Sequence, residues 1–563
     1  MRGRMLTAGI AAGLALLAPA IVAADCPSAT TDLADLLPPA AMQSGEDIRV
    51  RGVVSGDFRG DDGLRGFFLQ TRSDSDELPH GIFVFTPDLQ RGDLGFGAGD
   101  EVVVTGESAD FRGKPQIAWV QAVEVCARPG LPEPVTLPFP QADRDGWRRL
   151  EGVHVRVDET LTVTGNYDLA RFGALDLAAG GRLFRPTQFT DTRGDDHAAR
   201  RIILDDASYA RNPRPVPWLD RDGTRRVGSV LPELSGILTH AFGAWRIHPV
   251  EPEAVEFVAR NPRPDPPAAK PGAARVVGFN VENYFVTLGE RGAANRAELD
   301  QQRQQLEAVA GALQPALVGL AEVENRPAAV TDLTERLGRA AVGRAYQHFA
   351  IDEPVGTDAI RVALAWDPAR VERVAGPFID TADTHHRPPV AGHFRFGDEG
   401  PGKLVVVIHH KAKVGCPDEG DIDRGQGCWN LRRTEQSRAL ADFLQRKRER
   451  TGTDRVLIIG DINSYAAEDP VRLLQARGFG DLLASLPPEQ RYTYVFRGES
   501  GNLDVALASE SLAGDVTAAR PWPINADEPA ALHDFTRVDG PWRSSDHDPV
   551  VVDIHTRDGT RAE

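Results

Sequence analysis

The apolar positions of the chain follow one pattern up to about residue 260 and a different one from residue 274. Residues 47–126 and 150–258 contain short runs rich in Val, Ile and Phe, such as "GIFVFT" and "RIILDD", between turns rich in Gly and Asp. Runs of this length and spacing are typical of the strands of a small β-barrel or β-sandwich. These two blocks are therefore predicted to be all-β.

From residue 274, apolar strand patterns alternate with helical ones. The runs "RVVGFN", "GLAEVE", "VVVIHH" and "VLIIGD" indicate buried strands. Residues 297–314 indicate a helix, since its apolar positions recur on one face. These positions are Leu299, Leu306, Val309, Ala310 and Leu313. Strands that alternate with helices and loops predict an α/β domain of layered sheets.

The Pro-rich segment "NPRPDPPAAKPGA" separates the two patterns. Proline cannot donate to a β-ladder and favours a stiff, extended chain, so we expect a linker and a domain boundary here. The expected organisation is a signal peptide at 1–24, an OB-fold-like β domain at 25–130, a second β-rich OB-like domain at 131–260, the linker at 261–273 and an α/β domain at 274–557.

Residues 1–24 have the features of a secretory signal. Arg2 and Arg4 precede an apolar run that ends at Val22-Ala23-Ala24, which suits signal peptidase. No later stretch is long and apolar enough to cross a bilayer, so no membrane anchor is expected. The mature protein is expected to be exported, either to the periplasm or to the medium.

The four cysteines fit an oxidising compartment. Of the three possible pairings we expect Cys26–Cys126 and Cys416–Cys428. The second pair would close a short loop rich in Gly and Asp, and the first would tie the start of the mature chain to the end of the first β domain.

The formal net charge of −18 excludes a broad basic surface for phosphate backbones. It leaves room for nucleic-acid chemistry at a local site where metal ions supply positive charge. Because the chain has only six lysines, Lys411 and Lys413 stand out as candidate phosphate contacts.

The two β domains have two alternative roles, a spacer and a grip on nucleic acid. A grip needs basic and aromatic side chains together. The candidates in the first domain are Arg59, Arg65, Phe67, Arg112 and Trp119.

Polar residues recur where the apolar strand patterns of the last domain stop or start. The positions are Asn280, Glu322, His409, His410, Asp461, Asn463, Asp504, Asp546 and His547. Each one alone is explained as a turn residue or a satisfied structural histidine. Ligands of layered α/β folds bind beyond strand ends, however, so the set predicts one site.

The motifs "FNVENYF", "GLAEVEN", "GDINSY" and "SDHDPVVV", in this order, resemble the endonuclease/exonuclease/phosphatase superfamily, which includes deoxyribonuclease I. With "GNYDLARFG", "GRLFRPTQ" and "RIILDD" before them, the chain is most similar to exported bacterial nucleases with an OB-fold-like region. The resemblance implies a four-layered α/β-sandwich catalytic domain after all-β modules.

The resemblance also implies the metal and its ligands. Glu322 would be the principal Mg²⁺ carboxylate, with Asn280 beside it and Asp546 near a metal. Mg²⁺ prefers oxygen ligands and keeps several waters, so one or two carboxylates suffice. Calcium or manganese is a further candidate in addition to magnesium.

The same resemblance implies the catalytic groups. Asp461 and Asn463 would orient the attacking water and hold phosphate oxygens. His547 would act as general base or acid with Asp504 orienting its ring, and His409 would contact the scissile phosphate. A histidine paired to a carboxylate can take and return a proton near neutral pH.

The chain departs from those nucleases in two places. It has Ile408-His409-His410-Lys411-Ala412-Lys413 where they have Asn-His-Phe-Lys-Ser-Lys, and Leu503-Asp504-Val505 where they have Leu-Asp-His. His410 either compensates in part or points into the core. Asp548 is expected to be a structural turn residue.

The resulting hypothesis is a secreted, metal-dependent nuclease acting on DNA, with RNA as a further candidate substrate and no stable protein partner. Two alternatives stay open. One is a phosphomonoesterase or phospholipid phosphodiesterase of the same superfamily, although no apolar membrane-contact loop stands out. The other is a nucleic-acid-binding protein with a dead catalytic domain.

Overall fold

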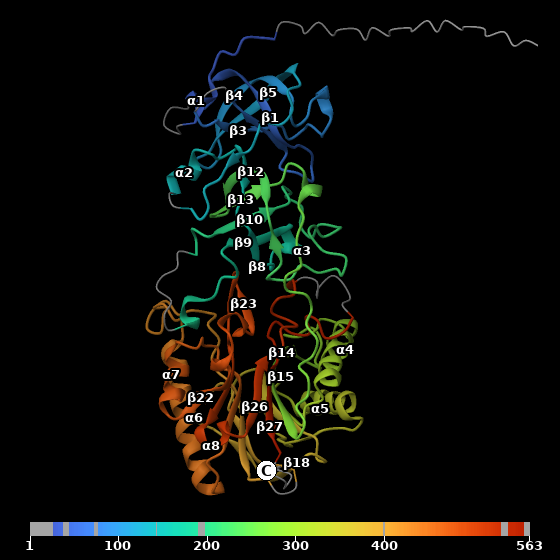
Figure 1. Cartoon of the computed structure of the whole chain (residues 1–563), viewed down its shortest axis with the longest axis vertical. Coiled ribbons are helices and arrows are strands. Elements are labelled where there is room, and N and C mark those ends of the chain that lie inside the picture. The colour runs from blue at the N-terminus through green and yellow to red at the C-terminus, as the bar shows by residue number, and fades with distance from the viewer. Residues whose placement is uncertain are drawn as a thin grey trace, which may run out of the picture. The chain divides into compact units, whose positions relative to one another are not determined.

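The computed structural model describes residues 26–37, 44–72, 77–141, 144–189, 197–397, 400–530 and 539–556 (Figure 1). The predicted signal peptide lies outside these residues. The chain divides into two compact units, one running to Glu133 with Leu150–His154, and one formed by Pro134–Arg149 and the chain from Val155 onward. In the described part of the chain, no helix is both long and apolar enough to cross a membrane.

The first unit is built on a closed barrel with the strand order β1-β2-β3-β5-β4. The alternating burial of β1 places Ile48 and Val50 in the barrel core, as the period of two of a half-buried strand requires. A short helix, α1 (Leu33–Leu36), adds Leu33 and Leu36 to this core. The strands are β1 (Asp47–Phe58), β2 (Gly66–Gln70), β3 (Gly81–Phe85), β4 (Glu101–Asp110) and β5 (Pro115–Ala127).

The barrel confirms the predicted all-β start of the chain and corrects two of the residues proposed for a grip. Phe67 is part of the barrel core, and Arg59 is buried in an ion pair with Asp57 at 2.8 Å. Arg65, Arg112 and Trp119 are exposed, and Trp119 keeps 75% of its surface accessible. A grip on nucleic acid by this unit can therefore use only these three of the five.

The second β-rich region forms an eight-stranded sheet with the order β11-β8-β9-β10-β13-β12-β7-β6. It is an open sheet in the described residues, whereas the first is a closed barrel. Its short helices are α2 (Arg144–Arg148) and α3 (Leu169–Phe172). Its strands are β6 (Val135–Thr136), β7 (His154–Val157), β8 (Leu161–Gly165), β9 (Ala174–Ala179), β10 (Arg201–Asp205), β11 (Val230–Leu231), β12 (Leu234–Ala241) and β13 (Ala244–His248).

The last region contains two six-stranded sheets, β16-β17-β15-β14-β27-β26 and β18-β19-β20-β21-β25-β22. The strands of the first are β14 (Ala273–Tyr284), β15 (Leu317–Glu324), β16 (Gln347–His348), β17 (Ile360–Trp366), β26 (Val516–Pro521) and β27 (Val550–His555). Those of the second are β18 (Val371–Ile379), β19 (Val390–Phe396), β20 (Lys403–His409), β21 (Val456–Asp461), β22 (Phe479–Asp481) and β25 (Asp504–Ser509). A hairpin of β23 (Tyr494–Phe496) and β24 (Glu499–Gly501) precedes β25.

Three hydrophobic clusters define four layers. One cluster lies between the two sheets and includes Val276, Leu317 and Val407. The others join each sheet to its own helices, which lie on opposite outer faces (Figure 1). The helices are α4 (Arg296–Leu313) and α5 (Pro327–Val342) on the first sheet, and α6 (Asn430–Thr451) and α7 (Asp469–Ala476) on the second, with the short α8 (Glu510–Ala513) after β25. The predicted layered sandwich is confirmed.

Helix α4 shows why the sequence folds in this way. Asn295 caps its first turn by accepting a bond from the backbone N–H of Glu298, and the predicted apolar face is buried against the sheet. The Pro-rich linker before β14 has no regular structure but is in contact with the last region. Asn261 and Arg263 bond to Asp527 and Glu528, so the linker is packed and not a free spacer.

Candidate active site

Adjacent strands of the second sheet bring three of the predicted residues together. His409 ends β20, Asp461 ends the parallel strand β21, and Asp504 starts the antiparallel strand β25. The register pairs His409 with Asp461, and Asp461 with Asp504. All three are buried, so the polar groups meet at one edge of the sheet, as expected of strand ends.

The first sheet supplies Asn280 and Glu322 to the same place. Asn280 lies in β14 and is fully buried, and Glu322 lies in the neighbouring parallel strand β15. The side-chain amide of Asn280 donates to Glu322 Oε1 at 3.0 Å and to Asp461 Oδ2 at 3.2 Å. The site is therefore built where the two sheets face each other.

His547 and Asp504 form a close acid–histidine pair. His547 Nδ1 lies 2.7 Å from Asp504 Oδ2, and the same oxygen accepts a bond from Thr493 Oγ1 at 2.7 Å. The opposite ring nitrogen, Nε2, lies 3.9 Å from Asp461 Oδ2. Burial lowers the pKa of His547, but nearby carboxylates, Asp504 first among them, outweigh burial and raise the pKa well above its ordinary value.

Tyr494 is a site residue that the sequence did not reveal. Its ring lies against the imidazole of His547, with centroids 4.6 Å apart and planes 31° from parallel. Packing of this kind fixes the plane of the imidazole, while the bond to Asp504 fixes the orientation of the ring within that plane. No motif marks Tyr494, which comes from the short hairpin strand β23.

Glu322, His409 and Asp461 form the group in the described residues that could hold a metal ion, with ligand atoms within 4.8 Å of one another. His409 Nε2 lies 3.4 Å from Asp461 Oδ2 and 3.9 Å from Glu322 Oε1. Carboxylate oxygens of Glu322 and Asp461 that lie this close together suit a hard divalent cation such as Mg²⁺. The position expected of Glu322 as a metal ligand is thus supported, and Asp461 joins it.

Two of the residues expected to bind metal have other contacts. Asn280 Oδ1 accepts the backbone N–H of Glu282 at 3.1 Å, and its NH₂ group faces the carboxylates. In this orientation Asn280 presents no oxygen to a metal ion bound by the carboxylates. Asn280 therefore orients the two carboxylates. Asp546 lies outside the metal-competent group and acts on His547, whose pKa its charge helps to raise.

Asp461 is the most strongly perturbed acid of this group. Burial raises its pKa to about 7, His547 opposes the shift, and the charges of Asp504 and Glu322 add to it. Its other oxygen, Oδ1, accepts the backbone N–H of Asn463 at 2.7 Å. A bound cation would favour the ionised form of Asp461 and reverse the direction of this shift.

Arg387 is a second residue that sequence reasoning missed. Its Nη1 donates to His409 Nε2 at 3.0 Å, and its Nη2 donates to the backbone oxygen of His410. An N–H donor at Nε2 requires that this nitrogen be unprotonated. Burial and the charge of Arg387 accordingly hold the pKa of His409 well below its usual value. His409 is neutral, and a buried cation stands beside it.

His410 points into the core and not into the site. It is fully buried, its Nε2 lies 3.3 Å from Ser437 Oγ, and its backbone oxygen accepts Asn463 Nδ2 at 3.2 Å. Asn463 is thereby anchored next to Asp461. Asp548 is also structural, since its Oδ1 accepts the backbone N–H groups of Asn525 and Ala526.

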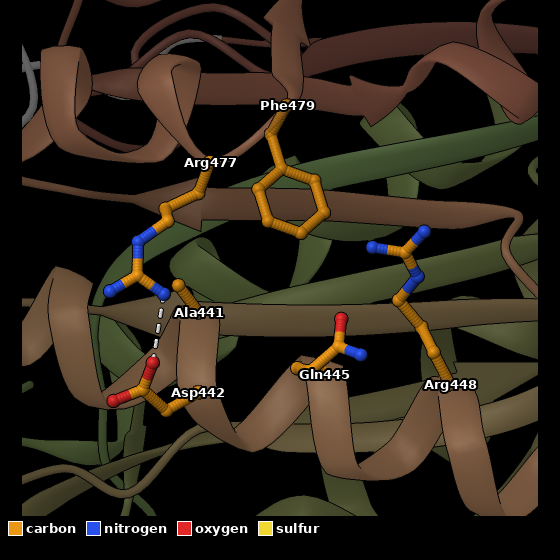
Figure 2. A pocket seen from close by; sticks show the side chains of 6 residues that line it. All are labelled: Ala441, Asp442, Gln445, Arg448, Arg477 and Phe479. Carbon is orange, nitrogen blue, oxygen red and sulfur yellow. Dashed lines mark hydrogen bonds and ion pairs between the residues drawn. The ribbon is translucent and has the colours of Figure 1, made fainter.

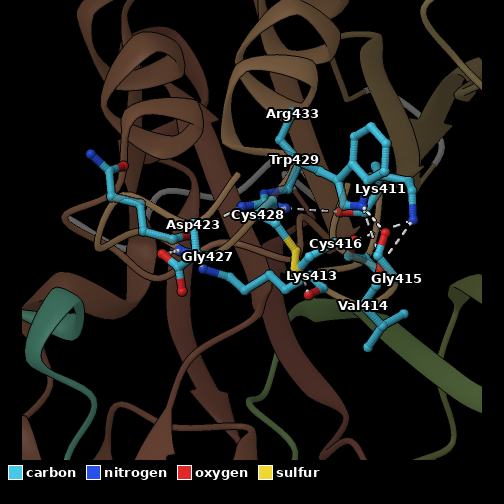
Figure 3. Close-up of a disulfide and its surroundings, with 12 residues drawn as sticks. Lys411, Lys413, Val414, Gly415, Cys416, Asp423, Gly427, Cys428, Trp429 and Arg433 are labelled. Atoms are coloured by element: carbon cyan, nitrogen blue, oxygen red, sulfur yellow. Dashed lines mark hydrogen bonds between the residues drawn. A yellow bond between two sulfur atoms is a disulfide. The ribbon is translucent and has the colours of Figure 1, made fainter. Parts of the chain in front are cut away.

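The two lysines expected to contact phosphate have partners elsewhere (Figure 3). Lys413 Nζ donates to Glu468 Oε1 at 2.6 Å and to the backbone oxygen of Gln426 at 2.7 Å. Burial lowers the pKa of Lys413 to about 8 although Glu468 opposes the shift. Lys411 Nζ lies 5.2 Å from the centre of the Trp429 ring and contacts backbone oxygens of its own loop. The ammonium of Lys413 is therefore committed to an ion pair.

Both expected cysteine pairings are present. Cys26 pairs with Cys126 in the barrel unit, and Cys416 pairs with Cys428 in the loop after Lys413, each with Cα atoms 5.4 Å apart. Figure 3 shows the second disulfide between Lys413 and Trp429. It closes a loop that Asp423 also stabilises by accepting the backbone N–H groups of Gly425 and Gly427.

The backbone of the site is strained at several residues. Glu322 has φ 65° and Asn463 has φ 52°, and Glu282 and Asn283 beside Asn280 also have positive φ. Left-handed backbone is unfavourable for a residue with a Cβ, and it persists where surrounding structure imposes it. At Glu322 the strand register is interrupted, and this aims the carboxylate at the cluster.

A surface cavity elsewhere on this domain contains none of these residues (Figure 2). Side chains of α6 line it together with Arg477 and Phe479, and Arg477 is paired with Asp442 at 2.9 Å. Three residues with strongly shifted pKa values, His409, Asp461 and His547, meet at the strand ends, so the cluster there is the candidate active site.

The model of the Endonuclease/Exonuclease/phosphatase family matches residues 277–547. This match identifies residues 277–547 as a domain of that family. Its members hydrolyse phosphoester bonds, and the site described above is that of a phosphoester hydrolase with a group of residues suited to a divalent metal. No curated protein matches the chain by sequence.

The solved structures to which the chain is similar match about half of it. The human Nocturnin catalytic domain is 17% identical, with 51% of this chain and 95% of that chain covered and a TM-score of 0.34. D. rerio TDP2 complexed with single strand DNA product is 16% identical (50% and 98% covered, TM-score 0.33). A Bacteroides thetaiotaomicron mannosyl-6-phosphatase is 16% identical (50% and 98% covered, TM-score 0.32).

Proposed function

We propose that the protein is an exported, metal-dependent nuclease that hydrolyses phosphodiester bonds of DNA. The observation that carries the proposal is the meeting of a metal-competent carboxylate pair, Glu322 and Asp461, with the His547–Asp504 pair. Acid–base groups and a cation position together are what hydrolysis of a phosphate ester requires.

Different side chains of the site carry out different parts of the hydrolysis. A water oxygen bonds to phosphorus, the P–O ester bond breaks, and one proton moves from the water to the leaving oxygen. His547 Nε2, which lies 3.9 Å from Asp461 Oδ2, is placed to take this proton and to give it to the leaving oxygen. Asn463, held beside Asp461 by the Asp461–backbone bond, is placed to orient the water or a phosphate oxygen.

Glu322 and Asp461 would hold the metal ion, with Asn280 orienting both carboxylates. When bound, a divalent cation neutralises charge on the phosphate and polarises its oxygens. Arg387 contributes a further positive charge beside His409. Together these groups give an acidic protein a local site for an anionic substrate.

Export and DNA as the first substrate are proposed from the sequence. The basic and apolar pattern of residues 1–24 is that of a secretory signal, and the two disulfides suit an oxidising compartment. The motif set resembles exported nucleases. RNA is the second substrate to be tested.

A substrate panel tests the proposal. Supercoiled plasmid, single-stranded DNA, RNA and p-nitrophenyl phosphate are each incubated with Mg²⁺ and with EDTA. We expect plasmid cleavage with Mg²⁺ and none with EDTA. Hydrolysis of p-nitrophenyl phosphate alone would identify a phosphomonoesterase. The absence of hydrolysis with Mg²⁺, Mn²⁺ or Ca²⁺ would refute the enzyme assignment and favour a binding protein.

A further inference from the structure

The segment that follows β26, residues 522–530, is held by buried charges from the eight-stranded sheet region. Asp527, which lies between β26 and β27, is fully buried. It pairs with Arg182 Nη1 at 2.8 Å and with Arg226 Nη2 at 3.3 Å. Arg182 follows strand β9 and Arg226 precedes strand β11, so both cations come from the preceding region of the chain.

The next residue, Glu528, is held from the same side. Arg226 Nη1 lies 2.6 Å from its Oε1, Arg263 Nη2 lies 2.9 Å from its Oε2, and Thr224 Oγ1 donates to Oε2 at 2.8 Å. Two adjacent buried carboxylates therefore have all these cationic partners outside the catalytic sandwich. An unpaired buried carboxylate is costly, so these contacts fix the conformation of residues 525–528.

One route leads from this loop to His547 through Asn525. The backbone N–H of Glu528 donates to the backbone oxygen of Asn525 at 3.0 Å. Asn525 Nδ2 donates to the backbone oxygen of His547 at 2.6 Å, and its backbone N–H donates to Asp548 Oδ1 at 2.7 Å. The segment that presents His547 is thus bonded directly to the segment that carries Asp527.

A second route reaches the carboxylate that orients His547. Tyr492 Oη donates to Asp527 Oδ2 at 2.7 Å, and the guanidinium of Arg182 lies 4.1 Å from the centre of the Tyr492 ring. The next residue, Thr493, donates through Oγ1 to Asp504 Oδ2, the oxygen that faces His547 Nδ1. Both members of the acid–histidine pair are therefore tied to Asp527.

We propose that Arg182 and Arg226 are positioning residues for the His547–Asp504 pair, and that the eight-stranded sheet is a working part of the catalytic unit. The two arginines touch no reacting atom. They act by holding Asp527, and with it Asn525 and Tyr492, in the arrangement that sets the imidazole. The inference rests on the proposed hydrolytic function for its readout.

The matched control is Arg246. Its side chain is about as buried as that of Arg182 and forms an ion pair with Asp205, but both residues of this pair belong to the sheet, in β13 and β10. Every contact of its guanidinium that the structure describes is also within this sheet region, with Ala241 and with the ring of Phe242. Loss of Arg246 therefore removes a buried pair from the same sheet without touching the route to His547.

The experiment compares full-length Arg182→Met, Arg246→Met and wild type on a small phosphodiester, bis(p-nitrophenyl) phosphate, with thermal melting of each. We expect kcat of Arg182→Met to fall about 10-fold or more with KM within threefold, because a small displacement of a catalytic group costs rate. Arg246→Met should melt at a similarly reduced temperature with kcat within twofold of wild type. A folded Arg182→Met with wild-type kcat, or equal kcat losses in both variants, would overturn the proposal.

Arg182→Lys covers the case in which Arg182→Met does not fold. Lysine keeps a positive charge beside Asp527. It lacks the planar guanidinium group, which bonds through two nitrogens and packs on the Tyr492 ring. We expect it to fold and to lose at least threefold in kcat at unchanged KM. Wild-type kcat in this variant would contradict the proposal. An inactive wild-type protein would instead count against the proposed function.

Discussion

His547 Nδ1 lies 2.7 Å from Asp504 Oδ2, and the opposite nitrogen of the same ring faces Asp461 Oδ2 at 3.9 Å. One side of the imidazole is fixed by a carboxylate, and the other is directed at the metal-competent group. In this arrangement Nε2 is the ring nitrogen that is placed to transfer a proton.

Replacement of His547 by alanine should lower plasmid cleavage by roughly 10²–10⁴-fold, the usual effect of losing a general acid or base. The fall is measured from initial rates of plasmid cleavage at saturating Mg²⁺. His555→Ala is the control, because His555 ends β27, the strand that follows His547, and is exposed. A His547→Ala rate within threefold of wild type would remove this residue from the mechanism.

Glu322→Gln should raise the Mg²⁺ concentration needed for the half-maximal rate, because it removes the negative charge that a hard cation needs and keeps the shape. Glu324→Gln is the control, since Glu324 lies in the same strand but accepts the backbone N–H groups of Val286 and Thr287. A Mg²⁺ titration of Glu322→Gln that superimposes on wild type would show that Glu322 is not a ligand.

Lys413→Met should destabilise the fold more than it affects substrate binding. It leaves the buried carboxylate of Glu468 without its cation, which costs about 3 kcal/mol of unfolding free energy. Chemical denaturation measures the loss, and Lys411→Met should lose less than about 1 kcal/mol. If Lys413→Met kept wild-type stability and raised KM for DNA, the lysine would be a phosphate contact after all.

Asp206 predicts a pH dependence of stability that is separate from the active site. Burial and the like charge of Asp205 raise the pKa of Asp206 to about 7, far above its value in an unfolded chain. The folded form therefore binds more protons between about pH 4 and pH 7, and its stability falls as pH rises through that range. Asp206→Asn should raise the melting temperature at pH 8 and leave it unchanged at pH 4. An equal shift at both pH values would contradict this assignment.

A chain beginning at Ala273 should not retain a stable catalytic domain, although every proposed catalytic residue lies beyond that point. It lacks Arg182, Arg226 and Arg263, so Asp527 and Glu528 lose the cationic partners that hold their segment in place. Breaking a buried ion pair by removing one partner costs about 3–5 kcal/mol where the remaining charge stays out of water. Circular dichroism melting checks this, and Asp527→Asn with Glu528→Gln in the short chain should recover part of the loss. A cooperative wild-type melting transition for the short chain would refute the expectation.

The fold of the last domain was largely predictable because its signals are local. The apolar face of α4 and the strand runs before Asn280, His409 and Asp461 depend only on spacing along the chain. Polar residues at strand ends also follow from the sequence, because parallel strands carry their ends to one edge.

The remaining features depend on contacts between distant segments. Arg387 and Tyr494 enter the site from loops and a short hairpin that carry no motif. Lys413 was expected at phosphate because a sequence shows its charge but not the buried Glu468 that takes it. Arg182 and Asp527 lie in two different domains of the expected organisation, on opposite sides of the Pro-rich linker. Their ion pair therefore gives no signal in the composition of either segment.

The positive φ of Glu322 has a consequence for how this family could lose activity. Glycine relieves left-handed backbone, so Glu322→Gly removes this strain, but it also removes a metal ligand and the acceptor of the Asn280 amide and of the Asn283 backbone N–H. Selection for catalysis therefore favours a carboxylate in a backbone conformation that glycine adopts at less cost. In a lineage released from that selection, glycine or asparagine at this position would be among the first changes to spread, and it would mark descendants that kept the sandwich and abandoned the chemistry.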